Sequence, residues 1–263
     1  MDLSKLTAGV ISLTKEVGEF IRGESLVFDR GQVEYKGLHD MVSYVDKTAE
    51  VKLVKGLRLL LPEAGFVTEE KTATITGEKY DWIIDPLDGT TNFIHGLPTY
   101  AISIALQCHG ELVLGVVYEI NRDECFSAWE NGGAYLNDNR ISVSKASGIE
   151  NTLLATGFPY YEFGRLDAYL AVLKELMQRC HGVRRIGSAA IDLAYVACGR
   201  FDAYFEFNLN SYDVAAGIVL VREAGGQIFD FTGGNKSIER REMLATNGLI
   251  SAELLLILDE KFN

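Results

Sequence analysis

Residues 80–93 of this chain read YDWIIDPLDGTTNF, the pattern of a buried strand that leads through two carboxylates into a short helix. The apolar Trp-Ile-Ile run within it is typical of a strand covered on both faces. Pro86 lacks the N–H group that a central ladder position needs, so we expect the strand to end at Asp85. Gly89 permits close backbone approach, and residues 90–92 suit the start of a helix, whose free N–H groups favour an anion.

Asp85 and Asp88 stand beside this helix start, where two carboxylates would repel a phosphate unless cations lay between them. Mg²⁺ commonly joins one or two carboxylates to phosphate oxygens, so the pattern predicts a site for a hard divalent metal. A solvated turn is an alternative, because Asp-Pro and Asp-Gly are common turn dipeptides. The spacing lacks the ligand positions of an EF-hand loop. Phosphatases with an aspartate nucleophile usually separate two Asp by one residue, and the two intervening residues here favour metal ligands.

Three motifs, taken in order, resemble the inositol monophosphatase family of Mg²⁺-dependent, lithium-sensitive phosphatases. They are the Glu69-Glu70 pair, residues 85–93 (DPLDGTTNF) and residues 212–217 (YDVAAG). The similarity covers nearly the whole chain. It implies an α/β fold layered as a five-layer α-β-α-β-α sandwich, rich in antiparallel sheet in its N-terminal half, and a homodimer.

The composition indicates one soluble catalytic unit, because 263 residues with 48% apolar and 24% charged residues can bury a sizeable core. Asp and Glu outnumber Lys and Arg by 37 to 25, and the formal charge of −12 opposes binding to nucleic acid or to anionic lipid. No segment is apolar and long enough for a signal peptide or a membrane span. The four cysteines show no paired metal or redox spacing, so we expect thiols in a cytoplasmic protein.

The apolar spacing predicts the elements of the N-terminal half. Helix 3–22 is followed by a hairpin over 26–36 that turns at 29–31, and by an antiparallel meander over 99–136. Asp46 is a candidate N-cap for a helix that Pro62 closes. The small, polar run 144–148 predicts a boundary between an N-terminal half, 1–148, and a C-terminal half, 149–263.

In the C-terminal half, four residues at helical spacing predict the buried face of a helix over 165–180, namely Leu166, Leu170, Leu173 and Met177. A strand is expected over 183–186, then a helix over 189–198 for which Ser188 is a candidate N-cap. A strand carrying Glu206 near its end precedes a helix that begins at residue 212. Capping alone would explain Ser188, and the helix dipole alone would explain Asp213 in a first turn.

The resemblance assigns further roles by residue match. It implies two or three Mg²⁺ ions held by Glu69, Asp85, the Leu87 carbonyl, Asp88 and Asp213. Glu69 and Thr90 would activate the attacking water, and Asp46 would orient Thr90. Neighbouring residues on a strand point to opposite faces, so Glu70 is expected to be a supporting residue.

Substrate contacts are also implied by the resemblance, with Glu206 accepting a hydrogen bond from a substrate hydroxyl. Tyr212 stands where the family pattern has Trp, which changes the substrate wall. The full set of expected substrate contacts is Glu69, Leu87, Asp88, Gly89, Thr90, Gly187, Ser188, Ala189, Glu206 and Asp213.

The function that the sequence predicts is Mg²⁺-dependent hydrolysis of a small-molecule phosphate monoester by direct attack of water, with inositol 1-phosphate as the leading substrate. Relatives that act on fructose 1,6-bisphosphate, histidinol phosphate or 3′-phosphoadenosine nucleotides are alternatives within the same class. A regulatory binding module that retains the fold is an alternative of another class.

Overall fold

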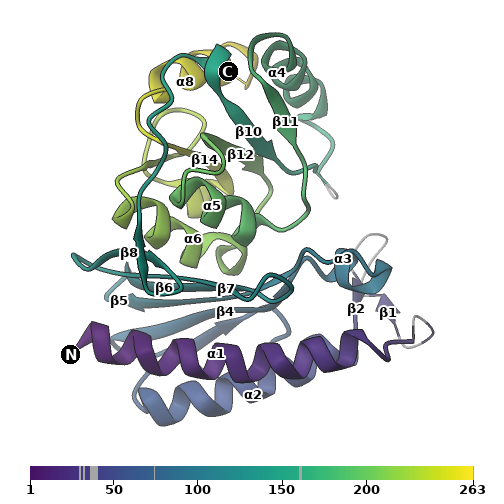
Figure 1. Ribbon diagram of the computed structural model, residues 1–263, viewed down its shortest axis with the longest axis vertical. Coiled ribbons are helices and arrows are strands. Elements are labelled where there is room, and N and C mark those ends of the chain that lie inside the picture. The colour runs from purple at the N-terminus through teal and green to yellow at the C-terminus, as the bar shows by residue number, and fades with distance from the viewer. Residues whose placement is uncertain (30, 32, 36–40, 74, 160–161, 263) are drawn as a thin grey trace.

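Two large β-sheets and three helical layers make up most of the computed structural model, which describes residues 1–29, 31, 33–35, 41–73, 75–159 and 162–262. Helices α1 (Leu3–Ser25) and α2 (Tyr44–Leu60) cover one face of a seven-stranded sheet. Helices α5 (Ala189–Ala197) and α6 (Ser211–Glu223) lie between this sheet and a five-stranded one. Helices α4 (Leu166–Arg179) and α8 (Ser251–Phe262) cover the far side (Figure 1). The expected α-β-α-β-α order is confirmed.

The seven-stranded sheet has the order β3-β4-β5-β6-β7-β8-β9, with β3 parallel to β4 and the other neighbours antiparallel. Trp82 and Ile84 of β4 pack into the core beneath α1 and α2, whereas Ile83 packs into the core against α5 and α6. This alternation confirms a strand buried on both faces. The strands are β3 (Gly65–Thr68), β4 (Tyr80–Asp88), β5 (Ala101–Cys108), β6 (Glu111–Glu119), β7 (Glu124–Trp129), β8 (Gly133–Leu136) and β9 (Asn139–Ile141).

Strand β4 does not end at Asp85, as the proline predicted. Asp85 is opposite Ser103 and Asp88 is opposite Ala101, so β4 has one more residue than β5 across this step. The register shift places Pro86 where the ladder is interrupted, so its missing N–H group breaks no regular pair. The strand therefore continues to Asp88, and α3 (Thr90–His95) follows Gly89 directly.

The five-stranded sheet has the order β11-β10-β12-β14-β13. Its central strand β12 is parallel to β10 and antiparallel to β14. A third core fills the space between this sheet and the outer helices α4 and α8. The elements are β10 (Leu153–Thr156), β11 (Gly182–Arg184), β12 (Ala203–Phe207), β13 (Gln227–Phe229) and β14 (Glu242–Thr246), with the short helices η2 (Ile149–Asn151) and α7 (Ser237–Arg240).

Two local expectations near the N-terminus are wrong. Helix α1 passes through Gly23 and ends at Ser25, where backbone contacts from Leu26 close the last turn. The predicted hairpin over 26–36 is replaced by β1 (Glu34–Tyr35), which pairs with the later strand β2 (Met41–Val42). Residues 30, 32 and 36–40 of this region lie outside the described residues.

The predicted buried face of α4 is only partly right, because the fully buried residues are Tyr169, Val172 and Leu176. From the predicted stripe, Leu166 and Leu173 are partly buried against the same core. Leu170 and Met177, from the predicted stripe, are 47% and 64% exposed. The Tyr169 ring contacts Phe205 and Phe207 of β12, and its hydroxyl donates to the Gly157 carbonyl at 2.7 Å. A large aromatic residue with a buried hydrogen bond determines the rotation of this helix about its axis, and the spacing of aliphatic residues did not predict it.

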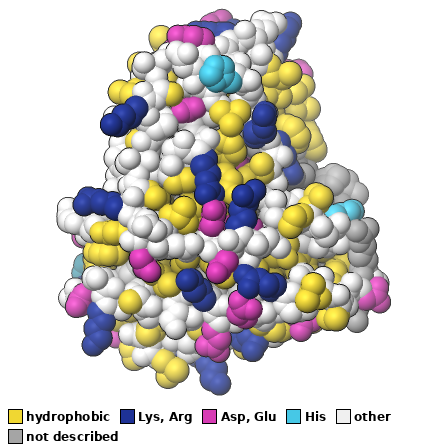
Figure 2. Space-filling view, in the orientation of Figure 1, with side chains coloured by type: hydrophobic (Ala, Val, Ile, Leu, Met, Phe, Trp, Pro, Cys, Tyr) yellow, Lys and Arg dark blue, Asp and Glu magenta, His cyan; other side chains and the backbone are white. Residues whose placement is uncertain are grey.

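The division into halves at residues 148 and 149 stays a prediction, and α5 and α6 of the second half pack on the sheet of the first. Acidic and basic side chains are interspersed on the face shown in Figure 2. Within the described part of the chain, no helix is both long enough and apolar enough to cross a membrane.

Close packing of α6 on the first sheet gives a test of this arrangement. A Cβ on Gly115 of β6 would lie 2.5 Å from the Ala216 carbonyl oxygen of α6, whereas a Cβ on Gly23 of α1 has nothing within 4 Å. We expect Gly115→Ala to lower the free energy of unfolding by about 1–3 kcal/mol. Gly23→Ala, the matched control, should raise it by about 0.5–1 kcal/mol. Denaturant unfolding of both variants measures the difference, and equal effects would contradict the packing described.

Candidate active site

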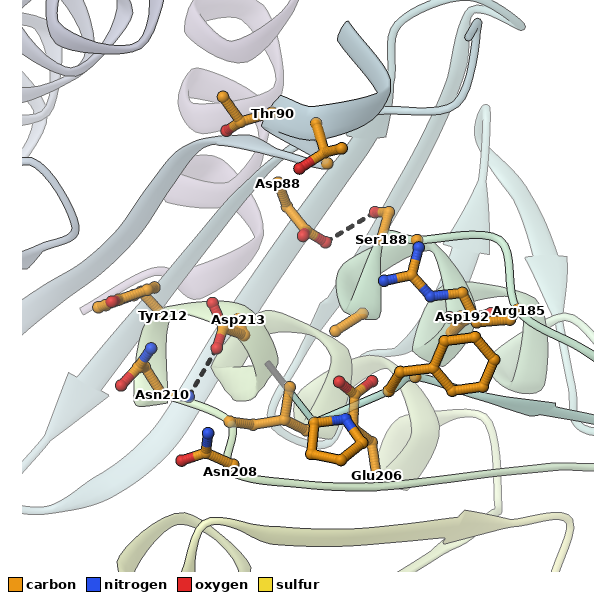
Figure 3. Close-up of a pocket in the computed structure, with 18 of the residues that line it drawn as sticks. Asp88, Thr90, Arg185, Ser188, Asp192, Glu206, Asn208, Asn210, Tyr212 and Asp213 are labelled. Atoms are coloured by element: carbon orange, nitrogen blue, oxygen red, sulfur yellow. Dashed lines mark hydrogen bonds between the residues drawn. The ribbon is translucent and has the colours of Figure 1, made fainter. Parts of the chain in front are cut away.

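A cavity of ≈ 220 Å³ lies between the two sheets, where the N-termini of α3, α5 and α6 meet the ends of β3, β4 and β12. Nine of the residues predicted for the site line this cavity, namely Glu69, Asp88, Gly89, Thr90, Gly187, Ser188, Ala189, Glu206 and Asp213. Figure 3 shows Asp88, Glu206 and Asp213 converging on this space from three different elements. The structure therefore brings the three sequence motifs together.

Asp46 is not the N-cap of α2, because Ser43 takes that position and Asp46 occupies the third helical residue of a capping box. Asp46 Oδ2 accepts hydrogen bonds from the Ser43 N–H at 2.9 Å and from its hydroxyl at 2.6 Å. The other oxygen, Oδ1, lies 2.9 Å from Thr90 Oγ1, which is also 2.9 Å from the Leu87 carbonyl oxygen. The capping box thus orients Asp46 toward Thr90, as the resemblance implied.

Asp213 occupies the same position in α6, three residues after the N-cap Asn210. The Asn210 N–H donates to Asp213 Oδ2 at 2.6 Å, and Figure 3 shows this bond at the edge of the cavity. Burial, followed by the charge of Asp88, raises the pKa of Asp213 to about 7. One oxygen of the Asp213 carboxyl group therefore accepts a hydrogen bond at the helix N-terminus. Ionising this carboxyl group still costs free energy.

Asp88 is held by a third helix start, although it belongs to β4. Ser188 Oγ and the Ala190 N–H, both at the N-terminus of α5, each donate to Asp88 Oδ2 at 2.7 Å. Ser188 is the N-cap, as predicted, with its hydroxyl 3.3 Å from the Ile191 N–H, but it also contacts the site. Burial raises the pKa of Asp88 to about 6, against the lowering effect of these hydrogen bonds.

Glu69 follows the last residue of β3, and the loop after it is held by a residue that sequence reasoning missed. Glu50 of α2, which is fully buried, accepts from the Glu70 N–H at 2.7 Å and from the Thr72 N–H and hydroxyl at 2.8 Å each. Glu50 lies one helical turn after Asp46, so both acids share one face of α2. The sequence did carry a signal for this role, because Glu50 lies four residues after Asp46 on a helix face that is otherwise apolar.

The carboxyl groups of Glu69 and Asp85 interact with each other inside the protein. Burial first, then the charges of neighbouring acids, raise the pKa of both groups well above their usual values. Two neighbouring buried carboxyl groups cannot both ionise at low cost. A bound cation would balance their charge.

The donor chemistry fits a hard divalent cation. Glu69, Asp85, Asp88 and Asp213 offer oxygen ligands, which Mg²⁺ and Ca²⁺ prefer. Among the described residues, no ion pair joins these four carboxylates to Lys or Arg. As the side chains are placed, no three His, Cys, Asp or Glu groups of the described residues stand at metal-binding spacing. Coordination would therefore require these carboxylates to turn toward a shared ion.

The opposite wall of the cavity carries Glu206, from the end of β12. Tyr204 donates its hydroxyl to Glu206 Oε2 at 2.5 Å, and burial raises the pKa of Glu206 to about 8. The Arg185 guanidinium lies 5.4 Å from the centre of the Phe158 ring, and both residues line this side. Tyr212, the residue that departs from the family pattern, also lines the cavity.

Comparison with known proteins supports a family assignment. The family model for the inositol monophosphatase family matches residues 2–260. An inositol-1-monophosphatase of Mesorhizobium japonicum is 42% identical over 240 residues, which covers 89% of this chain and 90% of that protein. A putative Nus factor SuhB of Neisseria meningitidis is 42% identical over 231 residues, which covers 88% of each chain.

Solved structures agree in fold. The extragenic suppressor protein SuhB from Bartonella henselae has a TM-score of 0.90 and 40% identity, covering 97% of this chain and 99% of that one. An inositol monophosphatase from Anabaena has a TM-score of 0.88 and 32% identity, covering 99% and 98%. The fold and its acid-lined pocket define a phosphatase of a generally metal-dependent class. The chain belongs to the inositol monophosphatase family.

The raised pKa values predict how stability depends on pH. Asp88, Asp213 and Glu206 bind a proton more tightly in the folded chain than in the unfolded chain, with pKa values of about 6, 7 and 8. Their contribution to stability is complete below about pH 4 and is lost as the pH rises through these values. We expect the Tm of metal-free protein, measured by calorimetry, to fall between about pH 5 and pH 8.

Added Mg²⁺ should raise the Tm more at the higher pH, because the carboxylates must lose their protons to bind it. Asp213→Asn serves as the matched control. It removes one titrating acid, so the Tm of the metal-free variant should fall less steeply as the pH rises. A metal-free Tm that rose steadily over this range would contradict the pKa values described.

Proposed function

We propose that this protein is a Mg²⁺-dependent phosphatase that hydrolyses an inositol monophosphate to inositol and phosphate. The observation that carries the proposal is the convergence on one cavity of acids held by helix N-termini, with the Thr90 and Asp46 pair on one side and Glu206 on the other. The family membership supports the reaction class.

Glu69, Asp85, the Leu87 carbonyl, Asp88 and Asp213 are the proposed ligands of two or three Mg²⁺ ions. Bound Mg²⁺ would neutralise charge on the phosphate and lower the pKa of bound water. Because phosphoryl transfer depends mainly on position and charge, the protein needs no covalent intermediate.

The chain's own groups would position the attacking water. Asp46 Oδ1 and the Leu87 carbonyl are both acceptors for the single Thr90 hydroxyl proton, so the Thr90 oxygen keeps lone pairs that can accept a hydrogen bond from the attacking water. Glu69, whose pKa is raised by burial and by the nearby Asp213, is suited to take up a proton from that water.

The phosphate and the leaving group would occupy opposite sides of the cavity. Backbone N–H groups of Gly89 and Thr90 are the proposed phosphate donors. Gly89 has φ 94°, and a Cβ there would lie 3.0 Å from the Thr99 carbonyl oxygen, so the backbone conformation at this turn requires glycine. Gly187, Ser188 and Ala189 would line the sugar or polyol side with Glu206.

A second candidate function is a regulatory binding role, because several similar relatives carry the name Nus factor SuhB. The presence of Thr90, Asp46 and the complete set of acids favours an enzyme. Phosphatase activity on fructose 1,6-bisphosphate, histidinol phosphate or 3′-phosphoadenosine nucleotides is the alternative within the enzyme class. Lithium inhibition and a homodimer, which the resemblance implies, stay predictions. A cytoplasmic location, which the cysteine pattern indicates, also stays a prediction.

Metal dependence is tested by Asp88→Asn. The amide oxygen can still accept from Ser188 and Ala190, but the negative charge is gone, so we expect kcat to fall by about a hundredfold or more. Phosphate release is measured with added Mg²⁺ and with a chelator. Asp202→Asn is the matched control, because Asp202 is a buried acid that accepts from Ser144 and Leu153 away from the cavity. Full activity in chelator would refute the proposal.

Substrate class is tested by a phosphate-release screen over polyol, sugar and nucleotide monophosphates, together with Glu206→Gln. Glu206→Gln replaces one acceptor oxygen of the carboxylate with an NH2 donor, and a bound hydroxyl that loses its acceptor costs about tenfold to a hundredfold in specificity. We expect kcat/KM for inositol 1-phosphate to fall by that factor, and for an alkyl phosphate without hydroxyls to fall much less. Equal losses would show that Glu206 supports the metal site or the fold.

A further inference from the structure

Asp192 of α5 is a buried acid that the function proposed above does not use. Its side chain is 1% exposed, and Oδ1 has no hydrogen-bond partner among the described residues. Asp192 also lines the cavity, on the side of Glu206 and Arg185, and Figure 3 shows it next to Arg185. It is therefore an unsatisfied carboxylate at the wall of the candidate active site.

Two other buried acids of this chain, Asp202 and Asp230, differ from Asp192 because donors of the chain itself satisfy them. Asp202 accepts from the Ser144 hydroxyl at 2.5 Å and from the Leu153 N–H at 2.7 Å. Asp230 accepts from the Thr232 N–H and hydroxyl and from the Gly234 N–H. Each of these acids ties a loop to a neighbouring element through donors of the chain itself. Asp192 Oδ1 has no such donor, so fold stability does not explain its position.

An unsatisfied buried carboxylate lowers the stability of the folded chain. Burial raises the pKa of Asp192 well above its usual value, and the charges of Glu206 and Asp88 add to that effect, while Arg185 opposes it. Such a group lowers stability unless a ligand supplies the missing donor. Asp192 lines the cavity, so a ligand held there would contact this side chain, and Glu206 is already the proposed acceptor for one hydroxyl in the same space.

We propose that Asp192 is a specificity-determining residue that accepts a hydrogen bond from a second hydroxyl of the leaving group, in addition to the hydroxyl bound by Glu206. This inference rests on the proposed phosphatase function and narrows its substrate class. The pocket then selects phosphate monoesters of neutral polyols that present at least two free hydroxyl donors. Phosphate monoesters of simple alcohols have no free hydroxyl that could donate to Asp192 or to Glu206.

The test compares Asp192→Asn and Asp192→Leu with the wild type, using inositol 1-phosphate and propyl phosphate. Asn keeps one acceptor oxygen without the charge, and Leu keeps similar size without any acceptor. We expect the ratio of the two kcat/KM values, inositol 1-phosphate over propyl phosphate, to fall by about tenfold to a hundredfold in Asp192→Leu and by less in Asp192→Asn. Removal of an unsatisfied carboxylate should leave the Tm of the Leu variant equal to that of the wild type or higher.

Asp202→Asn is the matched control, because it changes a buried acid that has its own donors. It should lower the Tm and leave the substrate ratio unchanged. An unchanged ratio in Asp192→Leu, or equal losses on both substrates, would overturn the role of Asp192. A lowered Tm in that variant would also overturn it, because the acid would then be structural.

A double variant distinguishes a direct contact between Asp192 and the substrate from an effect that acts through Arg185. In an Arg185→Gln background, the Asp192→Leu change should still lower the substrate ratio. If its effect disappears there, Asp192 acts by positioning Arg185 and the direct contact is refuted. A wild type that prefers inositol 1-phosphate while Asp192→Leu keeps the same preference refutes this inference alone. A wild type with no preference for inositol 1-phosphate refutes the proposed function as well.

Discussion

Repulsion among buried carboxylates is the constraint on which the site depends. Asp46, Asp88 and Asp213 are each held by hydrogen bonds at the N-terminus of a helix, namely α2, α5 and α6. A helix N-terminus offers free N–H groups and a positive dipole end, which stabilise a negative charge. The stabilisation is incomplete, since the pKa values of all three acids are raised by burial. The remaining charge is what a divalent cation would balance.

The layered architecture, which three hydrophobic cores hold together, brings three helix starts to one place. Helix α2 lies on the outer face of the seven-stranded sheet, and α5 and α6 lie between the sheets (Figure 1). Asp46 and Glu50, one turn apart on α2, contact Thr90 and the loop after Glu69. A single rigid helix thus sets the spacing between the proposed water-activating groups. The second sheet contributes Glu206 from the opposite side.

Much of the site could be predicted because its motifs are local. The acids at 85 and 88, the glycine at 89 and the helix start at 90 follow from turn and capping chemistry over a few residues. The predictions that proved wrong concern positions where contacts with another residue decide the structure. Asp46 is an acid near a helix start, which is typical of an N-cap, but Ser43 occupies the cap and Asp46 closes the capping box from the third helical position. The buried face of α4 was predicted from aliphatic spacing, and the contacts of Tyr169 with β12 decided otherwise.

The sequence by itself determined the doubly buried strand β4 and the pair of acids at 85 and 88, because these depend on residue type and short-range spacing. The roles of Glu69, Glu206 and Asp213 came from the resemblance to the family. Only the tertiary structure decided which groups satisfy those acids. Asp88 receives its donors from α5, 100 and 102 residues later, and Thr90 meets Asp46 across 44 residues. A hydrogen bond to a helix start can come from any segment that packing brings near. The same packing left Asp192 Oδ1 without a donor among the residues that the structure describes, and no local pattern in the chain predicts that.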